Sequence, residues 1–62
     1  MSMLDDMKDE LNYEVSKAAE PYLATKAKLV RDAIEFGFRQ LEAGATYAEA
    51  LAAAKQRLKE AA

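Results

Sequence analysis

The chain has 62 residues, no cysteine, no histidine and a formal net charge of −2. These values exclude disulfides, thiolate metal sites and every form of metal binding or general-base catalysis that uses histidine. A domain this short buries only about 60% of its unfolded surface, so without disulfides or a metal we expect it to gain stability by oligomerisation.

The first predicted element is an amphipathic helix over residues about 3–19, because apolar residues recur there at spacings of three and four. Ser2 precedes it as an N-cap, and Asp5 and Asp6 suit the positive end of the helix dipole. Residues 1–14 are strongly acidic and the remainder is mildly basic. The two parts either attract each other between subunits or are simply solvated.

Tyr13 lies opposite the apolar stripe of this helix. An exposed tyrosine is an efficient interface anchor, whereas an isolated surface aromatic needs no function. We take the first interpretation as the hypothesis for binding another protein. The candidate partner-binding residues are Tyr13, Asp6, Asp9, Glu10 and Lys17.

Pro21 is the only proline of the chain. It lacks a backbone donor and disfavours helical geometry at Glu20. Either the first helix ends near Ala19 and Pro21 begins a second one, or one long helix is kinked at Pro21. We favour the break.

The second predicted helix covers residues about 21–43 and has an apolar arc roughly 200° wide, against ~100° for an ordinary surface helix. One narrow neighbouring helix does not cover such an arc. We therefore expect a second copy to complete the core, in a dimer or a larger closed assembly. The candidate self-association residues are Leu29, Val30, Ile34, Phe36, Gly37, Phe38 and Leu41.

The outer face of this helix is charged. Lys28–Asp32, Arg31–Glu35 and Glu35–Arg39 are oppositely charged pairs at helical spacing, which favours the helix. Basic residues here are the candidates for an alternative function, nucleic-acid binding, although interleaved acids weaken their field. They are Lys26, Lys28, Arg31 and Arg39.

The third predicted helix covers residues about 47–60. Gly44 suits the left-handed residue that ends a helix, and Thr46 with Glu49 forms a capping box. The link between the two helices is so short that they should form an antiparallel hairpin.

Two short stretches resemble known families. Residues 25–34, Thr-Lys-Ala-Lys-Leu-Val-Arg-Asp-Ala-Ile, resemble the second helix of ribbon-helix-helix repressors and antitoxins, which implies a DNA-binding dimer with an N-terminal strand; residues 1–14 have a helical stripe instead. Residues 16–20, Ser-Lys-Ala-Ala-Glu, resemble the inhibitory helix of small antitoxins of Fic adenylyltransferases, but Pro21 follows where that helix has Gly or Asn.

The sequence thus predicts a single all-α domain over residues 1–62, a helical hairpin or three-helix chain that completes its core by oligomerisation. The function that we expect is non-enzymatic, without cofactor or metal. We expect a cytoplasmic, self-associating protein-interaction module, for example an inhibitor or antitoxin-like regulator of a larger protein. A dimeric nucleic-acid-binding regulator and a purely structural oligomerisation element are the alternatives. Charges interrupt every apolar run, so no membrane span is expected.

Overall fold

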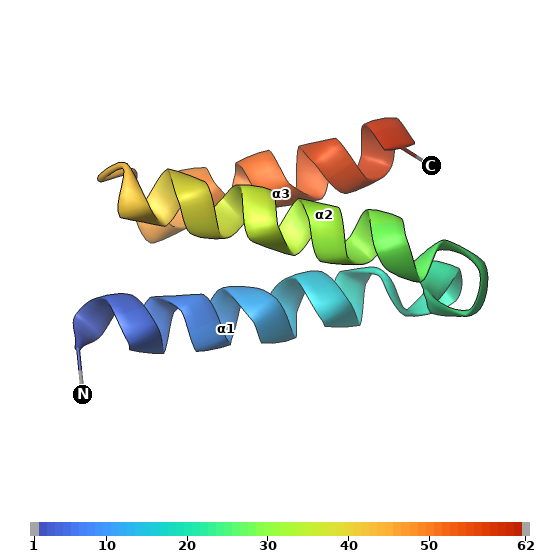
Figure 1. Cartoon of the computed structure of the whole chain (residues 1–62), viewed down its shortest axis with the longest axis horizontal. Helices are drawn as coiled ribbons and strands as arrows, with labels where there is room; N and C mark the ends of the chain where they lie inside the picture. The colour runs from blue at the N-terminus through green and yellow to red at the C-terminus, as the bar shows by residue number, and fades with distance from the viewer. Residues whose placement is uncertain (1, 62) are drawn as a thin grey trace.

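The protein folds into three α-helices arranged side by side. The computed structural model describes residues 2–61, and the side chains of these residues apart from 22–26 and 61. The helices are α1 (Met3–Ala18), α2 (Leu23–Glu42) and α3 (Tyr47–Ala61), with a short 3₁₀ turn, η1 (Glu20–Tyr22), between the first two. Figure 1 shows α2 antiparallel to both α1 and α3. The prediction of an all-α chain with three helices is confirmed, and over residues 2–61 no strand is present.

α1 begins where the sequence predicts. The Ser2 hydroxyl accepts a hydrogen bond from the backbone N–H of Asp5 at 3.1 Å, which satisfies one of the free donors of the first turn. The helix ends at Ala18, and the N–H of Ala19 still donates to the carbonyl of Val15 at 3.0 Å. The helix therefore ends within one residue of the predicted end near residue 19.

Pro21 breaks the helix and does not kink it. It occupies the middle of η1, and α2 starts only at Leu23 rather than at the proline itself. The missing donor and the ring of a proline disfavour helix continuation at this point. The chain consequently reverses direction, so that α1 and α2 lie side by side (Figure 1).

Gly44 ends α2. It is the one residue with a positive φ, 99°, among those described. Its N–H donates to the Leu41 carbonyl at 3.1 Å, and the N–H of Ala45 donates to the Gln40 carbonyl at 3.0 Å. This pair of bonds is the Schellman motif, which satisfies carbonyls that the end of the helix leaves free.

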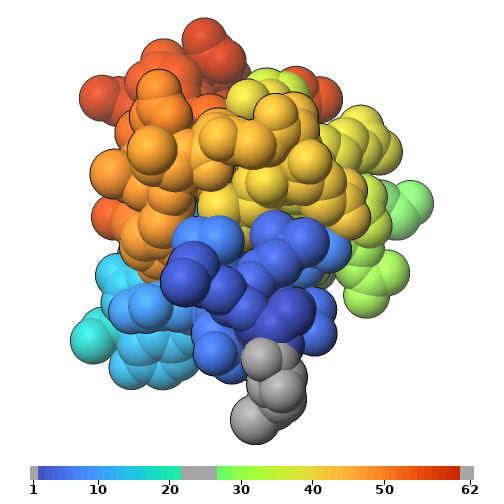
Figure 2. Space-filling view, turned by 90° about the vertical axis from the view of Figure 1, so that its left-hand side faces the viewer, coloured from blue at the N-terminus to red at the C-terminus, as the bar shows by residue number. Residues whose placement is uncertain are grey.

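The capping box at the start of α3 is complete. The N–H of Glu49 donates to the Thr46 hydroxyl at 3.1 Å, and the N–H of Thr46 donates to the Glu49 carboxylate at 2.9 Å. The predicted antiparallel hairpin of α2 and α3 is thus confirmed together with the hydrogen bonds that form it. Figure 2 shows the α2–α3 end of the molecule packed against the start of α1.

The core lies between the three helices. Gly37 of α2 is at a point where side chains of α1 and α3 pack closely against the backbone of α2. A Cβ atom there would lie 2.9 Å from both methyl carbons of Leu11 and 3.2 Å from the Cβ of Ala54. We call these three residues the Gly37 crossing. The buried apolar residues are Leu11, Val15 and Ala19; Val30, Ala33 and Leu41; and Ala50, Ala54 and Leu58.

The wide apolar arc of α2 is partly explained within one chain. We expected a second copy to cover it, on the premise that a single neighbouring helix cannot cover both flanks. Two helices of the same chain cover part of it, because the turns at Pro21 and Gly44 bring α1 and α3 against α2. Val30, Gly37 and Leu41, which we assigned to self-association, are buried in this monomer core.

Candidate interaction surfaces

Three hydroxyl groups of the described residues, those of Ser2, Ser16 and Thr46, have structural partners. The Ser2 and Thr46 hydroxyls cap α1 and α3, and the Ser16 hydroxyl donates to the side-chain oxygen of Asn12 at 3.4 Å. Over the described residues, no group of three acidic side chains could hold a metal ion. In the same part of the chain, no helix is long and apolar enough to cross a bilayer.

Tyr13 projects from α1 away from the core. Its side chain is 61% exposed, whereas Leu11 and Val15 on the opposite side of the helix are fully buried. The ammonium group of Lys17 lies 5.8 Å from the centre of its ring, a cation–π distance. With Ser16 and Glu20, these two residues line a shallow hollow of about 220 Å³. The ring is therefore presented to solvent beside a cation that partly fixes it.

The acids assigned to the same site divide into two groups. Asp6, Asp9 and Glu10 are all exposed on α1, as expected. The charge of Glu10, however, also acts on Tyr47 of α3, and so does that of Glu14. Glu10 is thus at the border of the site, on the side toward α3. We use the name Tyr13 face for the exposed residues Tyr13, Asp6, Asp9, Glu10 and Lys17.

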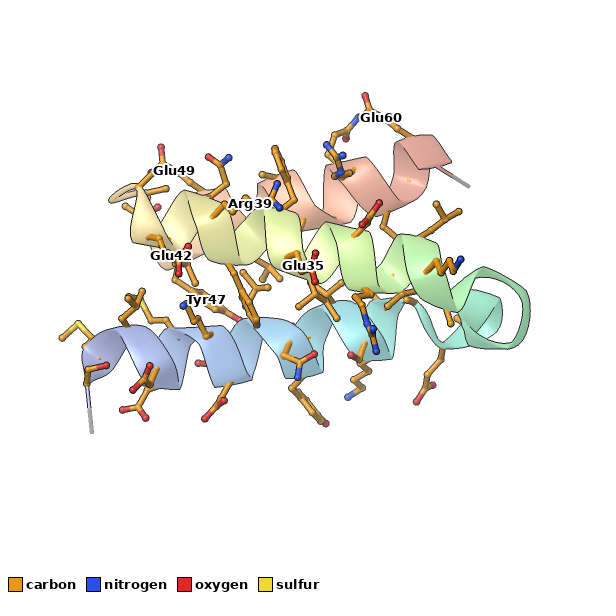
Figure 3. The ribbon with its side chains drawn as sticks, in the orientation of Figure 1. Glu35, Arg39, Glu42, Tyr47, Glu49 and Glu60 are labelled. Atoms are coloured by element: carbon orange, nitrogen blue, oxygen red, sulfur yellow. The ribbon has the colours of Figure 1, made fainter. Side chains whose placement is uncertain are left out.

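The described basic residues proposed for nucleic acid alternate with acidic residues along α2. Lys28, Arg31 and Arg39 are exposed on α2, and the side chain of Lys26 is outside the described set. Glu35 and Glu42 project from α2 along the same stretch as Arg39 (Figure 3). Alternating signs weaken the positive field that phosphates require.

The helical pairs expected on α2, such as Arg31–Glu35, do not close into ion pairs. Among the described side chains, the one ion pair joins Lys8 of α1 to Glu42 of α2 at 2.8 Å. Lys8 is the single base of the acidic front. The acidic residues 1–14 and the mildly basic remainder are therefore joined by an ion pair within one molecule. The base comes from the acidic part and the acid from the basic part, the reverse of what the net charges suggested.

The four remaining self-association residues are half-buried. They are Leu29, Ile34, Phe36 and Phe38. Phe36 lies under the guanidinium of Arg57 from α3, 4.8 Å from the ring centre. Phe38 lies near the ammonium group of Lys8, at 5.5 Å. Each aromatic ring of α2 is therefore partly covered by a cation from a neighbouring helix of the same chain.

A groove of about 350 Å³ runs between α1 and α2. Ile34 and Phe38 supply its half-buried apolar surface, and Asn12 forms its edge on α1. We call it the α1–α2 groove. Its lining residues are Asn12, Ala27, Val30, Arg31, Ile34, Glu35 and Phe38.

Sequence reasoning missed Lys8, Arg57 and Tyr47. The first two act across helices, so helical periodicity alone gives no signal for them. Tyr47 was expected only as the first residue of the third helix. Its ring reaches from α3 toward α1 (Figure 3), and its hydroxyl is buried without a hydrogen-bond partner among the described residues. Burial raises the pKa of Tyr47 above its ordinary value, and the charges of Glu10 and Glu14 raise it further.

Comparison with known proteins gives no relative. No family model, curated protein or solved structure matches this chain.

Proposed function

We propose that this protein is a small, non-enzymatic protein-interaction module that binds another protein through the Tyr13 face. The observation that carries the proposal is the 61% exposure of Tyr13 on the helix face opposite the fully buried Leu11 and Val15. The ring is not among the side chains that pack against the core. A partially exposed aromatic with a cation beside it can supply buried area in a complex at a small entropic cost.

The charges around Tyr13 indicate the chemistry of the partner. Asp6 and Asp9 are exposed and lack an ion-pair partner among the described side chains. Such carboxylates attract a basic surface and increase the rate of encounter, while the aromatic ring contributes affinity after contact. A basic segment or groove on a larger cytoplasmic protein fits this combination. An inhibitor or antitoxin-like regulator would act through such a contact.

Self-association is the second part of the proposal. Its original reason is weaker than the sequence indicated, since α1 and α3 of the same chain already pack against α2. What supports it now is the half-buried apolar surface of Ile34 and Phe38 in the α1–α2 groove. In this form of the proposal, folded monomers associate through an outer surface.

The test is a comparison of variants in affinity capture from the organism that encodes the chain. We expect the Tyr13→Ala variant to lose proteins that the wild type retains. The Tyr13→Phe variant should retain them, because this substitution keeps the aromatic ring. Met3→Ala is the matched control: Met3 is also on α1 and is 76% exposed. A Met3→Ala variant that loses the same proteins, or a Tyr13→Ala variant that loses none, would contradict the proposal.

The same preparation distinguishes the nucleic-acid alternative. We expect the double substitution Lys28→Ala with Arg31→Ala to leave partner binding unchanged, because acids interleave with these bases. Binding of duplex DNA by the wild type, with a steep dependence on salt and loss in the double variant, would replace the interaction module by a nucleic-acid-binding regulator.

A further inference from the structure

The exposed charges beside the α1–α2 groove follow an order that is complementary to itself. Along α2 the order is Arg31, Glu35, Arg39 and Glu42, or plus, minus, plus and minus. All four side chains are exposed. Glu35 and Arg39 lie on either side of position 37, and Arg31 and Glu42 lie at nearly equal distances from the same position. The charge pattern therefore becomes its own complement when the helix direction is reversed.

We infer that the α1–α2 groove is a homodimer interface, in which α2 of one copy lies antiparallel to α2 of a second copy about a two-fold axis near residues 36 and 37. This inference rests on the proposed self-association and specifies its surface. In a two-fold interface the same patch is used twice, so each contact occurs in two copies. The arrangement faces Glu35 with the second copy's Arg39, and Arg31 with the second copy's Glu42.

The apolar residues of the groove obey the same symmetry. Ile34 and Phe38 are centred on position 36, so the antiparallel arrangement brings Phe38 of each copy against Ile34 of the other. Both side chains are half-buried in the monomer and line the 350 Å³ groove. Removing their remaining apolar surface from water favours association. The centre of the interface is then apolar and its edges are charged, as in most protein interfaces.

Charge decides between the two directions in which the helices can pair. A parallel pair would place Glu35 against Glu35 and Arg39 against Arg39 of the second copy. Like charges facing each other across an interface oppose association. The antiparallel arrangement replaces these repulsions by attractions at both positions, and this complementarity is what identifies a second copy of the chain as the occupant of the groove.

The Lys8–Glu42 ion pair is compatible with this interface. Lys8 joins Glu42 from the side of α1 at 2.8 Å, while the Glu42 side chain keeps 53% of its surface exposed. A carboxylate accepts several hydrogen bonds at once, so Glu42 can accept from a guanidinium of the second copy as well. We regard the Glu35–Arg39 contacts as the decisive ones, because neither side chain has an ion-pair partner among the described residues.

Charge reversal tests the arrangement with the full chain. In a Glu35→Arg dimer, positions 35 and 39 of each copy are both arginine, so like charges face each other at both contacts. In an Arg39→Glu dimer both positions are glutamate, with the same repulsion. Sedimentation equilibrium from micromolar to millimolar protein should show each variant dimerising about tenfold or more weakly than the wild type. An equimolar mixture of the two should form a heterodimer of near wild-type strength, because all four contacts are then complementary. The double variant Glu35→Arg with Arg39→Glu should also dimerise.

The controls change charge by the same amount elsewhere. Asp32→Arg and Lys55→Glu alter exposed residues that do not line the groove, and both should dimerise as the wild type does. Circular dichroism establishes that each variant is folded. A wild-type dimer that neither reversal weakens, or a mixture that fails to associate, overturns this interface while self-association stands. A wild type that stays monomeric to millimolar concentration overturns both.

Discussion

The Gly37 crossing and the α1–α2 groove both involve α1 and α2, but the side chains are tightly packed at the crossing and loosely packed at the groove. At the crossing, glycine and alanine let three helices approach until Leu11 fills the remaining space. At the groove, Ile34 and Phe38 are half-buried and a volume of about 350 Å³ stays open. Small residues allow the backbones to approach closely, so the crossing stabilises the monomer. The larger side chains of the groove keep surface that a second chain can cover.

The largest predicted effect tests this difference directly. Leu11→Ala should lower the free energy of unfolding by about 2–5 kcal/mol, because it leaves a cavity at a fully buried site. Phe38→Ala removes a larger side chain but should cost less in the monomer, since part of that ring is already exposed. Urea denaturation at low protein concentration measures both. A Phe38→Ala variant that is destabilised more than Leu11→Ala would show that the groove, and not the crossing, supports the fold.

The next effect sharpens the description of the crossing. Gly37→Ala places a Cβ 2.9 Å from the methyl carbons of Leu11, and such overpacking costs about 1–3 kcal/mol. Alanine also favours the helix by about 1 kcal/mol relative to glycine. We therefore expect net destabilisation in the wild type and stabilisation in the Leu11→Ala background, where the space is free. A double-mutant cycle gives the coupling between the two sites. Equal effects of Gly37→Ala in both backgrounds would refute the close contact.

Much of the fold could be predicted because its signals are local. The helix ends are set by residues that interact with neighbours only a few positions away. The hydrogen bonds of Ser2 and of the Thr46–Glu49 pair form as expected, and Gly44 has the expected positive φ. The apolar stripes likewise identify which side of each helix is buried. Boundaries near Pro21 were less accurate, since a 3₁₀ turn separates the end of α1 from the start of α2.

What could not be predicted depends on contacts between helices. The width of the α2 arc requires two neighbours, but the sequence does not state whether they belong to the same chain. The ion pair of Lys8 with Glu42 joins residues 34 positions apart. In the candidate site, the exposure of Tyr13 follows from helical phase, whereas the open groove follows only from how far α1 and α2 approach each other.

The third prediction concerns the cap that orients α3 toward the crossing. Thr46→Ala removes the acceptor for the Glu49 N–H and should cost about 1 kcal/mol. Thr46→Ser keeps the hydroxyl and should cost less. Thermal unfolding monitored by circular dichroism measures both. Equal losses in the two variants would mean that the hydroxyl does not stabilise the start of α3.

Acid should weaken the same cap. Hydrogen bonds from the backbone and side chain of Thr46 hold the pKa of Glu49 below its ordinary value of 4.5. A lowered folded-state pKa contributes stability above pH 4.5, which is lost as the pH falls through the folded-state value. Glu49→Gln should remove this part of the pH dependence, and an unchanged acid profile in that variant would contradict it.

The smallest predicted effect has the opposite sign. Tyr47 packs its ring against the core, but its buried hydroxyl has no partner among the described residues. Tyr47→Phe removes the unsatisfied group and keeps the ring, so it should stabilise the monomer by about 0.5–1 kcal/mol.

The raised pKa of Tyr47 also makes the stability of the wild type depend on pH in alkaline solution. Above pH 10.0, the ordinary value, the unfolded hydroxyl ionises while the folded one resists, so this contribution to stability is lost as the pH rises through the folded-state pKa. The advantage of Tyr47→Phe over the wild type should therefore grow in alkaline solution. Unfolding curves of the two proteins that stay parallel from neutral to alkaline pH would show that the hydroxyl is solvated, and that the contact between α3 and α1 is open there like the groove rather than closed like the crossing.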